Sequence, residues 1–135
     1  MVRLLACATL LACAAVAHAE TWHFTYQGFH DTVTDTFTAD RRLDGAFTGT
    51  DHDRDGVLTR SEISSLVLHG HDYVACEADS NEYYHCGADA FSYALTGALH
   101  FSAGEYGSDP EGWVGGGHYY IAGDGEYGYR YTPAA

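Results

Sequence analysis

The chain has 135 residues, with 19 Asp and Glu against 6 Lys and Arg, and a formal net charge of −13. None of the basic residues is Lys. So negative a field repels nucleic acids and anionic membrane surfaces and attracts cations, which argues against nucleic-acid binding. The length suits one domain with a modest core.

Residues 1–19 resemble an export signal peptide. Arg3 gives a positive start, residues 4–16 form an apolar run, and Ala17-His18-Ala19 has the A-x-A form of a cleavage site. The run is too short to span a bilayer, and no later segment is long and apolar enough to be a transmembrane segment. We therefore expect a secreted or periplasmic protein whose mature part, residues 20–135, is a single domain.

Two early segments predict β-strands. Apolar and polar side chains alternate over residues 21–26 and again over residues 43–50. In the first segment Trp22, Phe24 and Tyr26 fall on one face, because successive side chains of a strand point to opposite sides.

The twelve residues that follow, Asp51 to Glu62, place oxygen donors at regular intervals. The donors at positions one, three, five, seven, nine and twelve are Asp51, Asp53, Asp55, Val57 through its carbonyl, Thr59 directly or through water, and Glu62. Gly56 supplies the sharp turn at position six, and Leu58 is an apolar anchor at position eight. Calcium takes six to eight oxygens at about 2.3–2.6 Å, so the spacing predicts a calcium site. The alternative is an acidic surface turn whose carboxylates are only solvated.

This segment resembles the EF-hand calcium loop at every liganding position, over about a tenth of the chain. The resemblance implies Ca²⁺ as the bound ion. In that family the loop lies between two helices and pairs with a second loop, which this sequence lacks. Gly45 and Gly49 precede Asp51 and disfavour a helix there, whereas Ile63, Leu66 and Val67 follow Glu62 at helical spacing. We therefore predict a strand, the loop and a short helix that ends near Gly70.

The cysteines fit an exported protein. Cys7 and Cys13 lie in the predicted signal peptide, and the mature chain keeps Cys76 and Cys86. One pair in an exported protein predicts a disulfide between them. A two-Cys metal or redox site is the alternative, although the C-x₂-C spacing is missing. Lipoprotein processing at Cys13 is the alternative to full secretion.

Two hairpins are predicted in the second half of the chain. Their strands and turns are residues 91–95 and 98–102 around Thr96-Gly97, and residues 118–121 and 126–131 around residues 122–125. In the second hairpin Tyr127, Tyr129 and Tyr131 would share one face. Turn residues recur roughly every eight to twelve positions, which indicates a mainly β fold, a small antiparallel sandwich or barrel.

Two weaker patterns point to other ligands. His69, His71 and Asp72 lie close in sequence and could hold a transition metal, although solvated histidines are the simpler interpretation. Trp113 with neighbouring tyrosines would suit a sugar ring if Trp113 is exposed, although a small β-domain also builds its core from aromatics. The Gly123-x-Gly125-x-x-Gly128 pattern is interpreted as a hairpin turn, because no helix is expected after it.

The sequence thus predicts calcium ion binding by an exported protein in which Ca²⁺ mainly stabilises the fold. The alternative is a calcium-dependent glycan- or surface-binding module. A small secreted hydrolase is less favoured. No catalytic motif is found, so we do not expect an enzyme. The signal peptide, Gly- and Tyr-rich strands and single Cys pair are also similar to small secreted bacterial proteins that carry one EF-hand-type loop.

Overall fold

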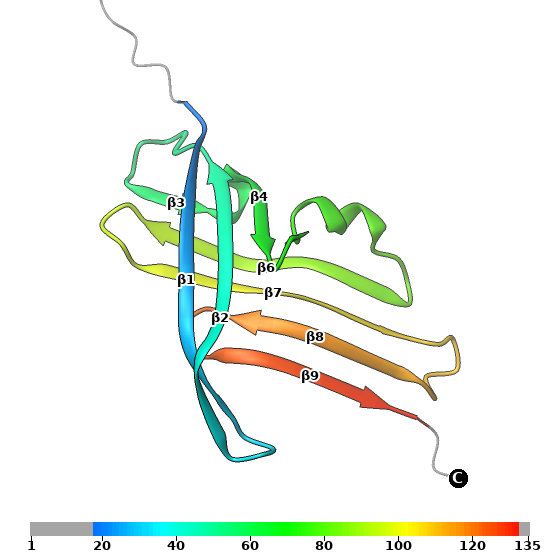
Figure 1. Ribbon diagram of the computed structural model, residues 1–135. Helices are drawn as coiled ribbons and strands as arrows, with labels where there is room; N and C mark the ends of the chain where they lie inside the picture. The colour runs from blue at the N-terminus through cyan, green and yellow to red at the C-terminus, as the bar shows by residue number, and fades with distance from the viewer. Residues whose placement is uncertain (1–17, 133–135) are drawn as a thin grey trace, which may run out of the picture.

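The structure is a computed structural model and describes residues 18–132. Most of the predicted signal peptide therefore lies outside the described residues. The chain forms two antiparallel sheets with strand orders β1-β2-β4-β5 and β3-β6-β7-β8-β9 (Figure 1). The mainly β prediction is confirmed. The sheets stay separate and do not close on each other, so the barrel alternative is wrong. Within residues 18–132, no helix has the length and hydropathy needed to cross a membrane.

The elements follow one another closely along the chain. The strands are β1 (Glu20–Asp31), β2 (Thr36–Gly49), β3 (Val57–Thr59), β4 (Ile63–Leu68), β5 (His71–Asp72), β6 (Tyr84–Ala94), β7 (Leu99–Ser108), β8 (Gly115–Ile121) and β9 (Gly125–Tyr131). Two 3₁₀ turns, η1 (Arg60–Glu62) and η2 (Ala75–Asp79), are the helical elements among the described residues.

The core lies where β1 and β2 cross over the second sheet (Figure 1). Phe47 on β2 is 1% exposed, and its ring centroid lies 5.0 Å from those of both Phe91 and Tyr93 on β6. On the neighbouring strand β1, Phe24 reaches Phe101 of β7 at 5.6 Å. Aromatic side chains therefore join the two sheets, as expected for a small core with few Ile and Val.

The four predicted strands and hairpins that frame this core are confirmed. Residues 21–26 lie in β1 and residues 43–49 in β2, and the two strands pair antiparallel. The hairpins are β6–β7 and β8–β9. In β2, the Phe24 ring lies so close to Gly45 that a Cβ at this position would overlap it.

The predicted exit helix is wrong: residues 63–68 form strand β4 instead. The cause is a β-bulge. Thr48 of β2 pairs with Ser65, but the next residue, Gly49, pairs with Ile63, so Ser64 is the extra residue. The bulge brings Ile63 to the buried side together with Leu66, which produces an i, i+3 spacing without a helix.

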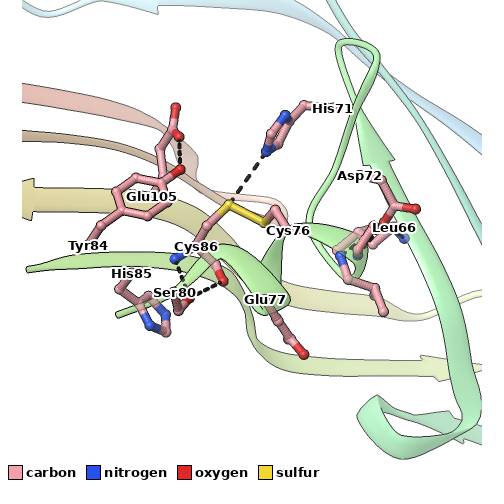
Figure 2. The surroundings of a disulfide bond; sticks show 12 residues. Leu66, His71, Asp72, Cys76, Glu77, Ser80, Tyr84, His85, Cys86 and Glu105 are labelled. Carbon is pink, nitrogen blue, oxygen red and sulfur yellow. Dashed lines mark hydrogen bonds between the residues drawn. A yellow bond between two sulfur atoms is a disulfide. The ribbon is translucent and has the colours of Figure 1, made fainter. Parts of the chain in front are cut away.

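A disulfide joins Cys76 on η2 to Cys86 on β6, as predicted (Figure 2). Both cysteines are buried. Ser80 closes the loop between them, since its Oγ accepts a hydrogen bond from the Cys86 N–H at 3.0 Å and donates one to the Cys86 carbonyl at 3.1 Å. His71 points toward the Cys86 sulfur, with Nε2 at 3.4 Å.

Candidate metal site

The acidic loop (Asp51–Glu62) connects β2 to β4 and is closed at its base by the backbone. The Thr50 N–H donates to the Glu62 carbonyl at 3.0 Å. Gly56 has φ of 81°, the left-handed conformation expected at the sixth position of the loop. The loop therefore begins and ends at one point of the first sheet, and turns back at Gly56.

Strand β3, inside the loop, attaches it to the second sheet. Val57 pairs with Ala94 of β6, and Leu58 pairs with Tyr93. The Leu58 side chain is 0% exposed, so the eighth position is the buried anchor that the sequence predicts. The acidic loop thus contacts both sheets, and its conformation is fixed from both sides.

The predicted carboxylates come together in the structure. Asp51, Asp53, Asp55 and Glu62 each offer one oxygen, and these four oxygens lie within 4.8 Å of one another. Two ligands on opposite sides of a calcium ion would be about 5 Å apart, given Ca–O distances of about 2.3–2.6 Å. The spacing of the four oxygens is therefore compatible with one shared Ca²⁺.

Backbone hydrogen bonds hold the aspartates in this arrangement. Asp51 Oδ2 accepts from the Gly56 N–H at 2.9 Å, and Asp55 Oδ1 accepts from the Val57 N–H at 2.9 Å. Asp51 Oδ1 is buried, and no donor among the described residues reaches it. Burying a carboxylate oxygen without a partner costs folding free energy. A cation at the centre of the loop would give this Asp51 oxygen a partner.

Glu62 is held as an anion by three hydrogen bonds. Its Oε1 accepts from the Thr59 N–H at 3.1 Å and from the Thr59 hydroxyl at 3.0 Å, and its Oε2 accepts from the His52 N–H at 2.7 Å. The Thr59 N–H lowers the pKa of Glu62. Because the Thr59 hydroxyl is bonded to Glu62, the role of Thr59 as a calcium ligand stays a prediction.

Asp51 and Asp53 influence each other as neighbouring acids. Burial acts to raise the pKa of Asp51, but hydrogen bonds, first that from the Gly56 N–H, outweigh it and leave the pKa below its usual value. The adjacent Asp51 side chain raises the pKa of Asp53. A divalent cation would relieve the repulsion that this pair carries when both groups are ionised.

The Val57 carbonyl faces away from β6. Gly56, the preceding residue, directs its carbonyl to the Leu95 N–H at 2.9 Å. Carbonyls alternate in direction along a strand, so that of Val57 is turned to the opposite edge. β3 is the end strand of its sheet, which leaves this carbonyl outside the ladder and available as the seventh-position ligand.

No local sequence pattern predicts one part of the site, the strand against which the loop pairs. In the EF-hand arrangement a second loop takes this place, and here β6 takes it through Ala94, Tyr93 and Ser92. The pairing joins residues more than thirty positions apart. Local patterns do not encode such a contact, so the structure alone reveals that β6 supports the loop.

The histidine alternative finds no support in the described part of the chain. Asp72 Oδ1 accepts hydrogen bonds from the N–H groups of Val74 and Ala75, at 2.9 Å and 3.2 Å, and therefore shapes the start of η2. The second group of potential metal ligands is His71, Cys76 and Cys86. Its two sulfurs are bonded to each other, so they are not thiolates that could bind a metal.

Trp113, the aromatic residue singled out for glycan binding, is 66% exposed. It lies in the β7–β8 connection, where its N–H donates to Asp109 at 2.7 Å. This connection lies beside the start of β6, because the Ser108 N–H donates to the Tyr83 carbonyl. The acidic loop pairs with the other end of β6, at residues 92–94. Eight to ten residues of a strand span about 30 Å, so the loop lies far from this connection. Figure 1 shows the two ends of β6.

Comparisons with protein-family models, with curated proteins and with solved structures found no match to this chain, so the chemistry of the acidic loop is argued from its own residues and geometry.

Proposed function

We propose that this protein binds one Ca²⁺ in the acidic loop and that the ion mainly stabilises the fold. The observation that carries the proposal is the convergence of four carboxylates, one of which belongs to Asp51. The Oδ1 atom of Asp51 is buried and has no donor among the described residues. Asp51, Asp53, Asp55 and Glu62 supply the charge, and the Val57 carbonyl supplies a neutral oxygen. Hard oxygen donors of this kind suit Ca²⁺ better than softer transition metals.

The position of the loop explains why the ion would act on stability. The loop starts at the end of β2, contributes β3 to the second sheet and returns to the first sheet as β4. Without a cation, several carboxylates repel one another at this junction of the two sheets. With Ca²⁺ bound, the repulsion becomes attraction, and both sheets are tied to one ion.

The surroundings that we infer are extracellular or periplasmic. The Cys76–Cys86 disulfide supports this, because disulfides persist mainly in oxidising compartments. Extracellular modules bind calcium with dissociation constants near the weak end, about 10⁻⁴–10⁻³ M. Such an affinity is sufficient for a structural ion outside the cell.

The test is a pair of thermal unfolding curves, one with millimolar calcium and one with a chelator. At the affinity given above, we expect about 10 mM calcium to add about 1–3 kcal/mol to the free energy of unfolding, through its selective binding to the folded state. Glu62→Gln should remove most of this increment. Glu82→Gln, at an exposed position outside the loop, is the matched control and should keep it. Coincident curves for the unmodified protein would end the proposal.

A second candidate function, binding of a glycan or cell surface, is favoured by the exposure of Trp113. The distance along β6 between Trp113 and the acidic loop argues that such binding would not require calcium directly. Calorimetric titration of polysaccharides into the protein, with and without chelator, tests both points. Trp113→Ala should abolish any heat of binding, and chelation should leave it unchanged.

A further inference from the structure

Two of the four strands at the ends of the sheets are long and leave one edge unpaired among the described residues. The end strands of the two sheets are β1 and β5, and β3 and β9. β3 and β5 have three and two residues, whereas β1 has twelve and β9 has seven. A long open edge offers a row of backbone N–H and C=O groups to another strand.

The sequence of β9 is complementary to itself when the strand is reversed. It reads Gly-Glu-Tyr-Gly-Tyr-Arg-Tyr from residue 125 to residue 131, with Gly128 at its centre. Antiparallel pairing of two copies about Gly128 places Glu126 opposite Arg130, and Tyr127 opposite Tyr129. Opposite charges and aromatic pairs are the cross-strand contacts that stabilise antiparallel sheets. Strand β1 carries no Arg or Lys, so its self-pairing brings no opposite charges together.

The register also agrees with the direction of the backbone groups. Alternate residues of a strand direct their N–H and C=O groups to opposite edges. Glu126, Gly128 and Arg130 belong to one alternating set, and in this register they pair only with one another. The hydrogen-bonding groups of the two free edges therefore meet in matching positions along the ladder.

The charged side chain of Arg130 lies on the inner face of the second sheet. On β8 it faces Gly116, and it makes no ion pair within residues 18–132. Glu126 lies on the same face, where it accepts from Arg41 at 2.9 Å and contacts His118 Nε2 at 2.6 Å. In the paired arrangement, Arg130 of the second copy lies next to Glu126.

Space for the second strand exists beside the start of β9. A half-open groove of about 680 Å³ lies between residues 125–128 and the β1–β2 hairpin, and Asp31, Asp124 and Glu126 line it together with Arg41, so carboxylates outnumber the guanidinium in the lining. The hairpin extends past β9 (Figure 1). The acidic lining is complementary to the guanidinium of Arg130 from a second copy, because that side chain would enter the groove from the inner face.

The outer face continues a pattern that already exists within one copy. The Tyr131 ring lies over Gly115 of β8, and the Tyr129 ring lies over Gly117. In the paired arrangement Tyr131 of the second copy lies opposite Gly125, beside the Tyr127 ring, whose nearest atom is 3.3 Å from where a Cβ of Gly125 would be. Tyr127 already stacks on Tyr119 at 5.0 Å, and pairing extends this row across both copies.

We propose that two copies of this chain form a homodimer by antiparallel pairing of their β9 strands about Gly128, which joins the second sheets into one continuous sheet. The interface is isologous, since the same strand serves on both sides of a two-fold axis. It is independent of the acidic loop, which lies at the other end of this sheet.

The first experiment is sedimentation equilibrium over a concentration series, in calcium and at about 0.15 M salt, so that the net charge of each copy is screened. We expect a monomer–dimer equilibrium. Arg130→Glu places two carboxylates opposite each other twice and should weaken the dimer by about tenfold or more. Arg42→Glu makes the same charge change on β2, away from the edge, and should not weaken it. A monomer at all concentrations would overturn the proposal.

The second experiment tests the register by cross-linking. In a Cys7→Ser, Cys13→Ser background, Gly128→Cys introduces one free thiol at the two-fold axis, where a Cβ meets no close neighbour. It should form an intermolecular disulfide readily under mild oxidation. Tyr131→Cys lies on the same strand, but its two copies would be about 20 Å apart along the ladder. Equal cross-linking of both variants would exclude this register, and cross-linking of Tyr131→Cys alone would contradict it.

Discussion

The two carboxylate oxygens of Asp51 lie in opposite environments. One carboxylate oxygen receives the Gly56 N–H, and the other is buried with no donor from the described residues. Tyr84, at the other end of β6, illustrates a different case: its neutral hydroxyl donates to the charged Glu105 Oε2 at 2.6 Å. When a side chain has such a specific partner, the effect of its substitution on stability can be predicted in direction and size.

Tyr84 predicts a change of stability at alkaline pH. Its hydrogen bond to Glu105 is the main cause that raises the pKa from 10.0 to about 12. Since the folded pKa lies above the unfolded one, the stabilisation is complete below pH 10 and is lost as the pH rises through about 12. Tyr84→Phe should cost about 1–2 kcal/mol below pH 10 and show a shallower alkaline decline. Urea unfolding at several pH values measures this, with the exposed Tyr83→Phe as control. Parallel pH profiles for Tyr84→Phe and the unmodified protein would contradict it.

Gly45 predicts a steric effect in the core. Gly45→Ala places a methyl group into the Phe24 ring and should cost about 1–3 kcal/mol, because a packed core resists added volume. Phe24→Leu combined with Gly45→Ala should recover part of this loss relative to the sum of the single changes. Additive losses in urea unfolding would show that the two side chains do not meet.

At the scale of elements, β3 is a short strand with a large consequence for the site. It is three residues long, yet it carries Leu58 into the core. Its pairing with β6 fixes the second half of the acidic loop. The proposed calcium site is therefore coupled to the packing of the second sheet.

This coupling predicts that a core substitution changes calcium binding. Leu58→Ala should cost about 2–5 kcal/mol of stability and also reduce the increment that calcium adds. Leu66→Ala removes an equally buried side chain, on β4, and should destabilise the protein without reducing that increment. Chemical unfolding with calcium and with chelator separates the two effects. The same increment in both variants would argue against a role for β3 in positioning the ligands.

Elements also show what the sequence can and cannot predict. Period-two alternation was sufficient for β1, β2 and both predicted hairpins, because those signals are local. It failed at residues 63–68, where one bulged residue imitates helical spacing. The four converging carboxylates were predictable from spacing alone. The support of the loop by β6 was not, since it depends on contacts between distant parts of the chain.

At the scale of the whole molecule, the two tryptophans report on different regions. Trp22 on β1 stacks on Phe47 at 5.3 Å and contacts Tyr93 at 5.7 Å, and Tyr93 is the β6 partner of Leu58. Trp113 lies exposed at the far end of β6. The path from the acidic loop to a fluorophore is therefore short for Trp22 and long for Trp113.

A calcium titration followed by tryptophan fluorescence should consequently depend on Trp22. We expect Trp113→Phe to keep the calcium-dependent change in emission and Trp22→Phe to lose it. The midpoint of the titration in Trp113→Phe should match the concentration at which calcium begins to raise the melting temperature. A response that disappears with Trp113 instead would place the conformational change at the β7–β8 connection.

The tyrosine rings that lie over glycines on the outer face of the second sheet constrain which sequences this fold accepts. Gly115 is not buried, yet any larger residue there would collide with the Tyr131 ring. The same holds for Gly117 beneath Tyr129. Backbone atoms of β7 close the same spaces, since a Cβ at Gly115 would also meet the Gly107 carbonyl and one at Gly117 the Glu105 carbonyl. As related sequences diverge, both positions should therefore remain glycine even where a tyrosine of β9 is replaced. Two glycines retained on a strand that is not buried would mark the outer face even though it lacks a buried core.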